Sequence, residues 1–274
     1  MTEFENIAIG KSSIPALGIT VIVMIVIPVA FFIYWRINHR DKTNISYLVA
    51  GAVGFIVSAR VLELGVHYFC ILADNPVSAF INGHTAVYVI YGTVMAGVFE
   101  EGGRYIILKF IMKKNRTREN AVLYGIGHGG IEILTVLLPA MMLYFAVAVL
   151  FSTLDVKGAL SALNITEETA AAAFPSIQAA AAFDYPDMAM NVIERLFAIL
   201  VHIGFTIVVF YGIKYAKGGY LILAILLHMA VDTFPALYQK GEVPLWAVEV
   251  WAAIWTVITL FIAIRLYKNM GEDL

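Results

Sequence analysis

The chain has 274 residues, of which 61% are hydrophobic and 14% are charged, and its formal net charge is −2. Soluble domains are usually about half apolar, so this composition excludes an ordinary soluble domain and indicates a polytopic membrane protein. The near-neutral charge argues against nucleic acid as a partner. The single cysteine, Cys70, excludes an intramolecular disulfide.

Seven apolar stretches are long enough to cross a bilayer as helices, which takes roughly 20 residues each. They occupy residues 14–35, 46–72, 86–112, 119–151, 191–213, 219–238 and 244–267. The fourth stretch is too long for one straight span and contains Pro139, so we expect a kink or an extra interfacial piece there. The sequence therefore predicts an all-α membrane bundle of about seven transmembrane helices, with a single domain over residues 1–274.

Lysine and arginine residues predict the orientation of the spans, because they gather on cytoplasmic loops. Eleven of them follow the first, third, fifth and seventh stretches: Arg36, Arg40, Lys42, Lys113, Lys114, Arg116, Arg118, Lys214, Lys217, Arg265 and Lys268. Only Lys11, Lys157 and Lys240 would lie on the other side. This pattern predicts an outside N-terminus and a cytoplasmic C-terminus. Residues 152–190 would then form an extracytoplasmic loop or cap, where alanine runs favour short helices.

Ionisable side chains interrupt four of the spans. They are Glu100, Glu101 and Arg104 in the third, His128 and Glu132 in the fourth, His202 in the fifth, and His228 and Asp232 in the sixth. A charged side chain at the centre of a span costs roughly 2.5–3.5 kcal/mol, so the five carboxylate and guanidinium groups would cost on the order of 15 kcal/mol if left alone. We therefore expect them to pair, to face water or to bind a cation.

The depth of these groups predicts that they meet. Counted from the cytoplasmic ends of their spans, the histidines and glutamates at 100, 101, 128, 202 and 228 lie about 9–12 residues in, which is roughly 14–18 Å at 1.5 Å per residue. Four helices that place imidazole or carboxyl groups in one layer favour a single cavity, which we expect to be reached from the cytoplasmic half.

Spacing along each helix adds detail. Glu100 and Arg104, His128 and Glu132, and His228 and Asp232 are pairs four residues apart, and the members of each pair share a helix face. A carboxylate one turn from a histidine can orient the imidazole of a metal ligand. Glycines surround two of these groups, at positions 102, 103, 125, 127, 129 and 130. They allow a neighbouring helix, a peptide backbone or water to come close, although such spacing also occurs where helices simply pack.

Two further polar groups stand apart from this layer. Arg60, Glu63 and His67 lie at positions i, i+3 and i+7 of the second span, which favours an internal ion pair on one face. Glu194 and Arg195 near the outer end of the fifth span are read as a structural or lid pair. Substrate positioning is the alternative for either group.

The order of the motifs resembles a known group of enzymes. EExxR on one span, HxxxE on the next and HxxxD on a later one are similar to the CAAX-processing and bacteriocin-related intramembrane proteases and to the PrsW proteases. Within this superfamily the chain, from about residue 50 to 260, most resembles the YhfC family of membrane peptidases. Arg104 is one residue closer to the glutamates than in the EExxxR of CAAX-type enzymes. That spacing leaves open whether Glu100 or Glu101 is the catalytic glutamate.

The resemblance implies hydrolysis of a peptide bond in a membrane-embedded or membrane-tethered substrate, at a bacterial or archaeal plasma membrane. Glu100 or Glu101 would act as general base on a water held against His128, and His228 would complete a metal site or stabilise the oxyanion. Zinc is the expected cofactor, held by His128, His228 and Glu100, and it would lower the pKa of a bound water to about 7. The groups that would orient these residues are Arg104, Glu132, Asp232 and His202.

Three alternatives remain open at this point. A glutamate-type protease without metal is one, because the HExxH signature of zinc proteases is absent. A proton- or ion-coupled transporter would use the same residue types as a relay, although no inverted repeat is visible. In a membrane scaffold or sensor the charges would only fix helix register, and no metal would bind.

Overall fold

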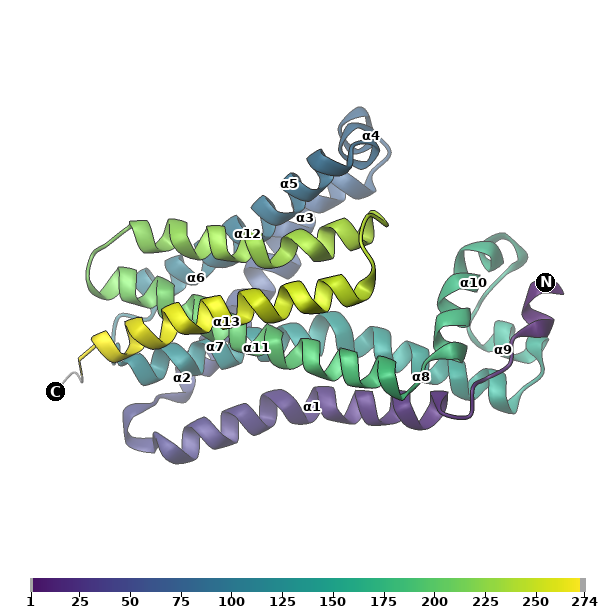
Figure 1. Cartoon of the computed structure of the whole chain (residues 1–274), viewed down its shortest axis with the longest axis horizontal. Coiled ribbons are helices and arrows are strands. Elements are labelled where there is room, and N and C mark those ends of the chain that lie inside the picture. Colours follow the sequence, from purple (N-terminus) through teal and green to yellow (C-terminus); the bar gives the residue numbers. More distant parts are fainter. Residues whose placement is uncertain (1, 272–274) are drawn as a thin grey trace. The chain divides into compact units, whose positions relative to one another are not determined.

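The computed structural model describes residues 2–271, and within this range it consists of helices without strands (Figure 1). The α-helices are α1 (Ser13–Asn38), α2 (Ile45–Phe55), α3 (Leu64–His67), α4 (Pro76–Gly83), α5 (Thr85–Ala96), α6 (Gly102–Ile106), α7 (Arg118–Glu132), α8 (Leu138–Thr153), α9 (Val156–Ala162), α10 (Glu167–Ala182), α11 (Tyr185–Lys214), α12 (Gly219–Gln239) and α13 (Leu245–Asn269). Wider π-helical turns connect several of them: η3 (Ile56–Glu63), η4 (Tyr68–Leu72), η5 (Gly97–Glu101), η6 (Ile107–Ile111) and η7 (Ile133–Leu137). Short 3-10 helices are η1 (Thr2–Asn6) and η2 (Arg40–Lys42).

Six helical runs among the described residues are long and apolar enough to cross a membrane. They are Ser13–Asn38, Ile45–Leu72, Arg118–Thr153, Tyr185–Lys214, Gly219–Gln239 and Leu245–Asn269. The predicted third span is also helical, from α5 through η6, but four charged side chains between positions 100 and 109 lower its hydropathy. The predicted helical membrane bundle is confirmed, whereas the count of seven crossings stays a prediction.

The long fourth stretch forms one helical run with a π-helical turn at Ile133–Leu137, which ends two residues before Pro139. Proline lacks an N–H group, and its ring collides with the carbonyl group four residues earlier in a regular α-helix. A wider turn at this place relieves that conflict, and such turns are often inserted at irregular points of long helices. The irregularity expected at Pro139 therefore takes the form of a π-helical turn.

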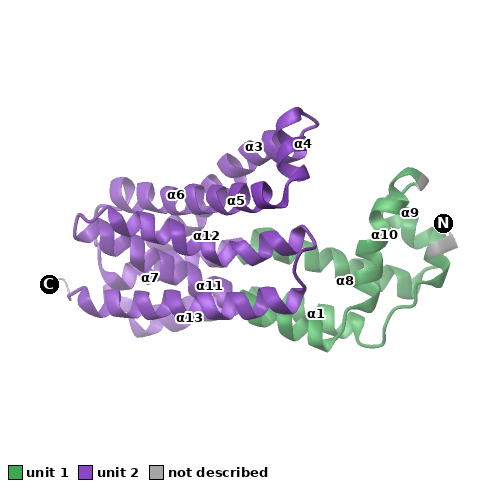
Figure 2. Cartoon of the chain, turned by 45° about the horizontal axis from the view of Figure 1, so that its top comes forward, with its two compact units in different colours: residues 1–27, 133–195 green, residues 28–132, 196–274 purple. Residues whose placement is uncertain are grey.

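The chain divides into two compact units, residues 1–27 with 133–195 and residues 28–132 with 196–274 (Figure 2). The points of division fall inside apolar helical runs, and the single domain expected from the sequence stays a prediction. All eight ionisable residues of the predicted polar layer belong to the second unit.

The first unit has its own small core. Phe4, Leu160 and Ile177 are buried together there, and the hydroxyl group of Ser13 donates a hydrogen bond of 2.6 Å to the carbonyl oxygen of Ala181. Helices α9 and α10 lie in the 152–190 segment and belong to this unit. The core therefore ties both helices to the beginning of the chain.

In the second unit, helix α7 is buried on every side from Glu119 to Gly130. Its glycines explain how this is possible. A Cβ atom on Gly127 would lie 2.0 Å from the carbonyl oxygen of Leu48 in α2, and one on Gly125 would lie 2.6 Å from the Cα atom of Ile203 in α11. Backbones that approach this closely exclude any side chain. The glycines of the GIGHGG stretch thus serve helix packing, and they place His128 between α2 and α11.

Candidate active site and metal centre

The π-helical turn η5 ends in Glu100 and Glu101, which are only 8% and 0% exposed. A π-helix has more residues per turn than an α-helix, so consecutive side chains diverge less around its axis. Both carboxyl groups can therefore point into the unit. Isolated π-helical turns are frequently found at functional sites.

Glu101 is held by a closed set of partners. Nη1 of Arg104 lies 2.5 Å from both carboxylate oxygens, and Arg104 is fully buried. Nδ1 of His228 donates a further hydrogen bond of 2.9 Å to Oε1 of Glu101. Such a charge-assisted arrangement fixes the carboxylate strongly, and it leaves Glu101 little freedom to react.

Glu100 has different surroundings. Its Oε2 accepts a hydrogen bond of 3.0 Å from Nε2 of His128 and lies 3.9 Å from Nδ1 of His202. One donor atom from each of these three residues lies within 4.8 Å of the other two, and all three residues are buried. Two imidazoles and one carboxylate are a common ligand set for zinc.

His128 supplies a test of how well a metal ion fits. The residue is fully buried, and while Nε2 faces Glu100, Nδ1 has no hydrogen-bonding partner. The ring of Phe55 packs against the imidazole edge-on at 5.2 Å between ring centroids. Nε2 is the nitrogen that a cation beside Glu100 would bind, and the ring proton would then lie on Nδ1.

His202 has a carboxylate on one ring nitrogen, as metal-binding histidines often have, and a guanidinium group on the other. Nη2 of Arg104 donates to its Nδ1 at 3.1 Å, which places the ring proton on Nε2, and Nε2 lies 2.6 Å from Oε2 of Glu132. A carboxylate on one ring nitrogen orients a histidine whose other nitrogen faces a metal. Nδ1 is the nitrogen that faces Glu100.

The predicted partner of Glu132 was His128, four residues earlier on the same helix. The contact to His202 on α11 corrects this prediction. Glu132 follows Gly125 and Gly129 on the side of α7 that packs against α11, so its carboxyl group reaches across to that helix. His128 has its own partner in Glu100.

His228 lies between two carboxylates. Its Nδ1 bonds Glu101, and its Nε2 lies 3.3 Å from Oδ2 of Asp232, one turn further along α12. The side chain of Asp232 is a third exposed, unlike the other groups around it. His228 is outside the group of three close donors, and His202, predicted only as an orienting residue, lies inside it. The depth of His202 in the fifth span was the signal in the sequence that indicated this residue.

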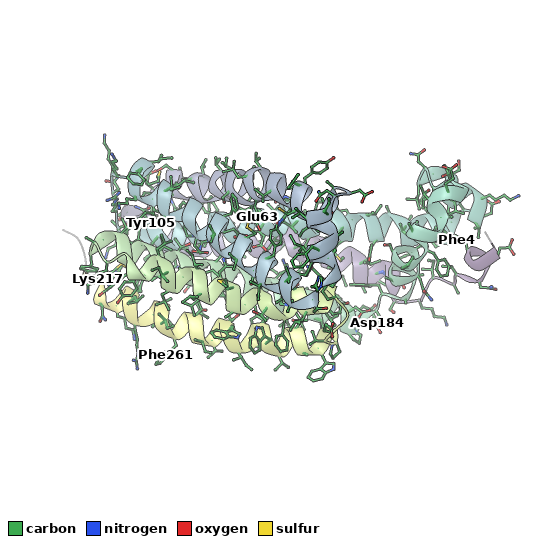
Figure 3. All side chains as sticks on the ribbon, turned by 90° about the horizontal axis from the view of Figure 1, so that it is seen from above. Phe4, Glu63, Tyr105, Asp184, Lys217 and Phe261 are labelled. Atoms are coloured by element: carbon green, nitrogen blue, oxygen red, sulfur yellow. The ribbon has the colours of Figure 1, made fainter. Side chains whose placement is uncertain are left out.

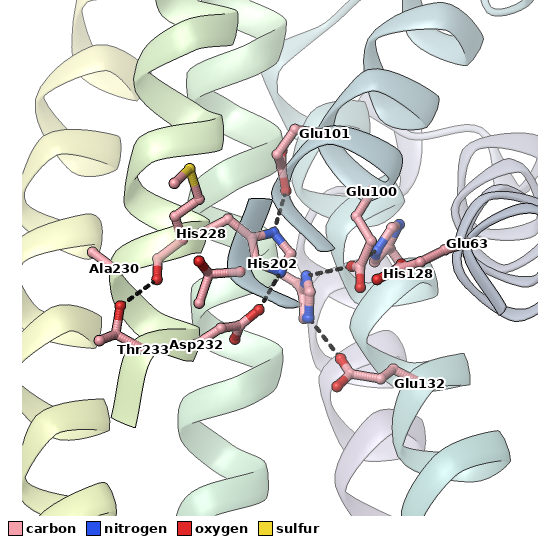
Figure 4. A network of polar contacts seen from close by, with 12 residues as sticks. Glu63, Glu100, Glu101, His128, Glu132, His202, His228, Ala230, Asp232 and Thr233 are labelled. Atoms are coloured by element: carbon pink, nitrogen blue, oxygen red, sulfur yellow. Dashed lines mark hydrogen bonds and ion pairs between the residues drawn. The ribbon is translucent and has the colours of Figure 1, made fainter. Parts of the chain in front are cut away.

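The charges of the network do not balance. Glu100, Glu101, Glu132 and Asp232 carry four negative charges when ionised, and Arg104 supplies one positive charge. With neutral imidazoles this leaves three negative charges in a largely buried place, which is unfavourable. A divalent cation together with one proton, or protons on all three histidines, would restore neutrality. Figure 4 shows how these groups converge from separate helices.

The second polar group of the sequence differs from its prediction. Glu63 is buried and its Oε1 lies 3.1 Å from Nε2 of His67, but Arg60 is exposed and forms no ion pair with Glu63. The reason is that residues 56–63 form the π-helix η3, in which a spacing of three residues no longer keeps two side chains on one face. Glu194 and Arg195 contact each other and belong to the first unit.

Fold and site together define a class: an integral membrane protein whose helices bury a network of glutamates and histidines able to hold a metal ion. The chain belongs to the YhfC intramembrane metalloprotease family, which it matches over residues 23–252. It is also 28% identical, over 261 residues, to the uncharacterized membrane protein YhfC of Bacillus subtilis (strain 168). That match covers 94% of this chain and 96% of the relative. No solved structure matches the chain.

Proposed function

We propose that this protein is an intramembrane metallopeptidase that hydrolyses peptide bonds of membrane-embedded or membrane-tethered substrates. The observation that carries the proposal is the group of Glu100, His128 and His202, whose donor atoms lie within 4.8 Å of one another inside a helical membrane bundle. The family to which the chain belongs is described as intramembrane metalloproteases, which agrees with this reading.

Glu100, His128 and His202 would hold the ion, and zinc suits two imidazoles and one carboxylate with an open fourth position. When bound, such an ion activates a water molecule and polarises the carbonyl group of the peptide. Glu132 lies beside Nε2 of His202, so Nδ1 would be the coordinating nitrogen, and the ion would take the place of the contact that Nδ1 now makes with Nη2 of Arg104. We assign the role of ligand to Glu100 rather than Glu101, because Arg104 and His228 already occupy Glu101.

The pair of His228 and Asp232 would handle protons. Glu101 fixes the ring through Nδ1, so that Nε2 faces Asp232 on the accessible side of the network. A proton held between Nε2 and the carboxylate can be donated to the oxygen of the attacked carbonyl or to the leaving amine. The proton released by the attacking water would return to the same pair, which restores it for the next turnover.

The test combines metal analysis with a cleavage assay on the purified full-length protein. We expect about one zinc ion per chain, lost together with cleavage of a membrane-tethered peptide in His128→Ala and in His202→Ala. His84→Ala is the matched control, because His84 is an exposed histidine outside the network, and it should keep both properties. Unchanged metal content in both site variants would rule the proposal out.

A proton- or ion-coupled transporter is the second candidate. It is favoured by two runs of polar contacts between groups that can take up and release protons, one from Glu132 through His202 and Glu100 to His128 and one from Glu101 through His228 to Asp232. Such chains can relay protons within a membrane. Proteoliposomes decide between the two: substrate uptake driven by a pH gradient, without cleavage of any peptide, would favour transport.

The location is proposed on the charge asymmetry of the loops. We place the protein in the plasma membrane of a bacterium or archaeon, with the N-terminus outside and the C-terminus in the cytoplasm. Cysteine labelling of the loops in intact cells tests this arrangement, since only residues on the outer side should react with an impermeant reagent.

A further inference from the structure

A cavity of about 370 Å³ borders the network where Asp232 is exposed. Its volume falls in the range of about 300–1,000 Å³ that is usual for ligand pockets. Three helical runs line it: the run that contains Glu63 and His67, helix α5, and the second half of α12. Glu63 and Asp232, which both belong to its wall, are drawn with the network in Figure 4.

Helix α5 leads from this cavity directly to the proposed metal ligand. Tyr88, Gly92 and Ala96 line the cavity at intervals of four residues, so they share one face of the helix. The next position at this interval is Glu100. The wall of the cavity thus continues into the carboxylate of the candidate metal centre.

Helix α12 also leads from the cavity to the network of ionisable residues. Asp232 and Ala236 line the cavity at an interval of four residues, and His228 precedes Asp232 by the same interval. At the far end, the hydroxyl group of Tyr88 donates a hydrogen bond of 2.7 Å to Oε1 of Gln239. A chain segment in this cavity would therefore extend from the end of α12 to the reactive groups.

The cavity lies in the half of the helical bundle that is remote from its lysine- and arginine-rich end, whereas the sequence predicted access from that end. Lys217 lies two residues before the start of α12, and the cavity follows the second half of this helix toward Gln239. In Figure 3, Glu63 lies among the helices of the second unit, away from the end that carries Lys217. Access from the lysine- and arginine-rich end was predicted because depth was counted from that end.

The wall of the cavity is acidic. Its acidic or imidazole side chains are Glu63, His67 and Asp232, and the residues described in this wall include no lysine or arginine. Glu63 is 6% exposed, and its carboxylate contacts an imidazole rather than a cation. His67 is in turn placed by a contact of 2.9 Å between its Nδ1 and the hydroxyl group of Tyr91.

The acidic groups and the apolar positions of this wall together suit one kind of side chain. A carboxylate in a poorly solvated place attracts a cation strongly and repels an anion. Apolar wall positions such as Ile71, Ala96 and Pro235 can pack against an aliphatic stem. Lysine and arginine carry such a stem below their charge, whereas a lipid chain offers no partner for Glu63 or His67.

We propose that this cavity binds the substrate segment beside the scissile bond, and that Glu63 selects a lysine or arginine side chain in that segment. The peptide part of this proposal rests on the proposed function. The acidity of the cavity and its access to water do not depend on that function, and both can be tested without any enzymatic assay.

The first experiment measures the charge preference of the cavity. Gly92 is the attachment point, because a Cβ atom there meets no atom within 4 Å. In full-length protein that carries Cys70→Ala, Gly92→Cys is treated with a cationic and an anionic methanethiosulfonate reagent of similar size. Rates are normalised to those of a free thiol. Gly83→Cys is the matched control, since Gly83 is exposed, outside the cavity wall and equally unhindered.

We expect Gly92→Cys to prefer the cationic reagent by about tenfold or more, and Gly83→Cys to show no such preference. Adding Glu63→Gln, which keeps the size of the side chain, should reduce the preference at Gly92→Cys severalfold. Equal normalised rates at Gly92→Cys would overturn the proposal. So would a preference that Glu63→Gln leaves unchanged, or a lack of reaction at Gly92→Cys while Gly83→Cys is modified.

The second experiment uses membrane-tethered peptides that differ only in a lysine or a glutamate next to the cleaved bond. We expect at least a tenfold higher kcat/KM for the lysine peptide, and loss of this difference in Glu63→Gln. Cleavage of both peptides at equal rates would refute the selectivity while keeping the peptidase. Charge-selective labelling without cleavage of either peptide would refute the proposed function and, with it, the peptide as occupant.

Discussion

The two adjacent glutamates should respond in opposite ways to the loss of their charge. Glu101 and Arg104 are both fully buried, and one guanidinium nitrogen lies 2.5 Å from both carboxylate oxygens. Glu101→Gln removes the negative charge and leaves the guanidinium group buried without a counter-charge. Removing one partner of a buried pair typically costs about 3–5 kcal/mol. Glu100 has no such partner, and a glutamine at position 100 can still accept the hydrogen bond of His128.

We therefore expect Glu101→Gln to destabilise the protein by about 3–5 kcal/mol and Glu100→Gln by about 1 kcal/mol or less. For a chain of this size the larger loss corresponds to a decrease in Tm of roughly 6–20 °C. The double variant Glu101→Gln with Arg104→Met should recover part of the loss, because it removes the unpaired charge as well.

The four tryptophans of the chain allow thermal unfolding in detergent to be followed by fluorescence. All variants should be measured without added metal and in the presence of a chelator, so that stability is separated from metal binding. The reasoning would be refuted if Glu101→Gln unfolds at the temperature of the wild type. A double variant that is less stable than Glu101→Gln alone would contradict it too.

Three further predictions concern other parts of the second unit. Gly127→Ala should lower the free energy of unfolding by at least about 3 kcal/mol or prevent folding, because its Cβ would lie 2.0 Å from the carbonyl oxygen of Leu48. Gly92→Ala should raise the free energy of unfolding by up to about 1 kcal/mol, because a Cβ there meets no atom within 4 Å. Thermal unfolding compares the two variants. Glu132→Gln should weaken metal binding about 10–100-fold by loosening His202, as measured by competition with a chromophoric chelator. Protein that holds its ion at a concentration 100 times the Kd should lose about 3 kcal/mol of its free energy of unfolding when a chelator removes the ion. Added zinc should restore this stability. An unchanged Tm after removal of the ion would contradict a metal site in the folded state.

The predicted layer of ionisable groups required only hydropathy and depth. Burying carboxylates in a membrane is so costly that Glu100, Glu101 and Asp232 could hardly be placed anywhere but in an interior shared with the histidines. The structure brings all eight of these residues into one network. Spacing alone also predicted the contact of His228 with Asp232, since both lie on a regular α-helix.

Contacts between side chains on different helices could not be predicted from hydropathy, depth and spacing. Spacing tells which face of a helix a side chain occupies, but it does not tell which helix packs against that face. Glu132 was therefore assigned to His128, although it reaches His202 on α11. Rules of spacing also assume 3.6 residues per turn, so the π-helix η3 separated Arg60 from Glu63. Nothing in the sequence marked the wider turn at η3.

A wider turn also explains why neighbouring glutamates have different roles. The sequence left open which of them pairs with Arg104, because one stands four and the other three residues before it. The π-helical turn η5 ends at Glu101, and regular α-helix begins at Gly102. Glu101 therefore keeps the α-helical relation to Arg104, in which residues three apart share a face. Glu100 lies inside the wider turn, is rotated away from the guanidinium group and faces His128 instead. One glutamate is thereby paired with a guanidinium group, and the carboxyl group of the other stays available to an external cation.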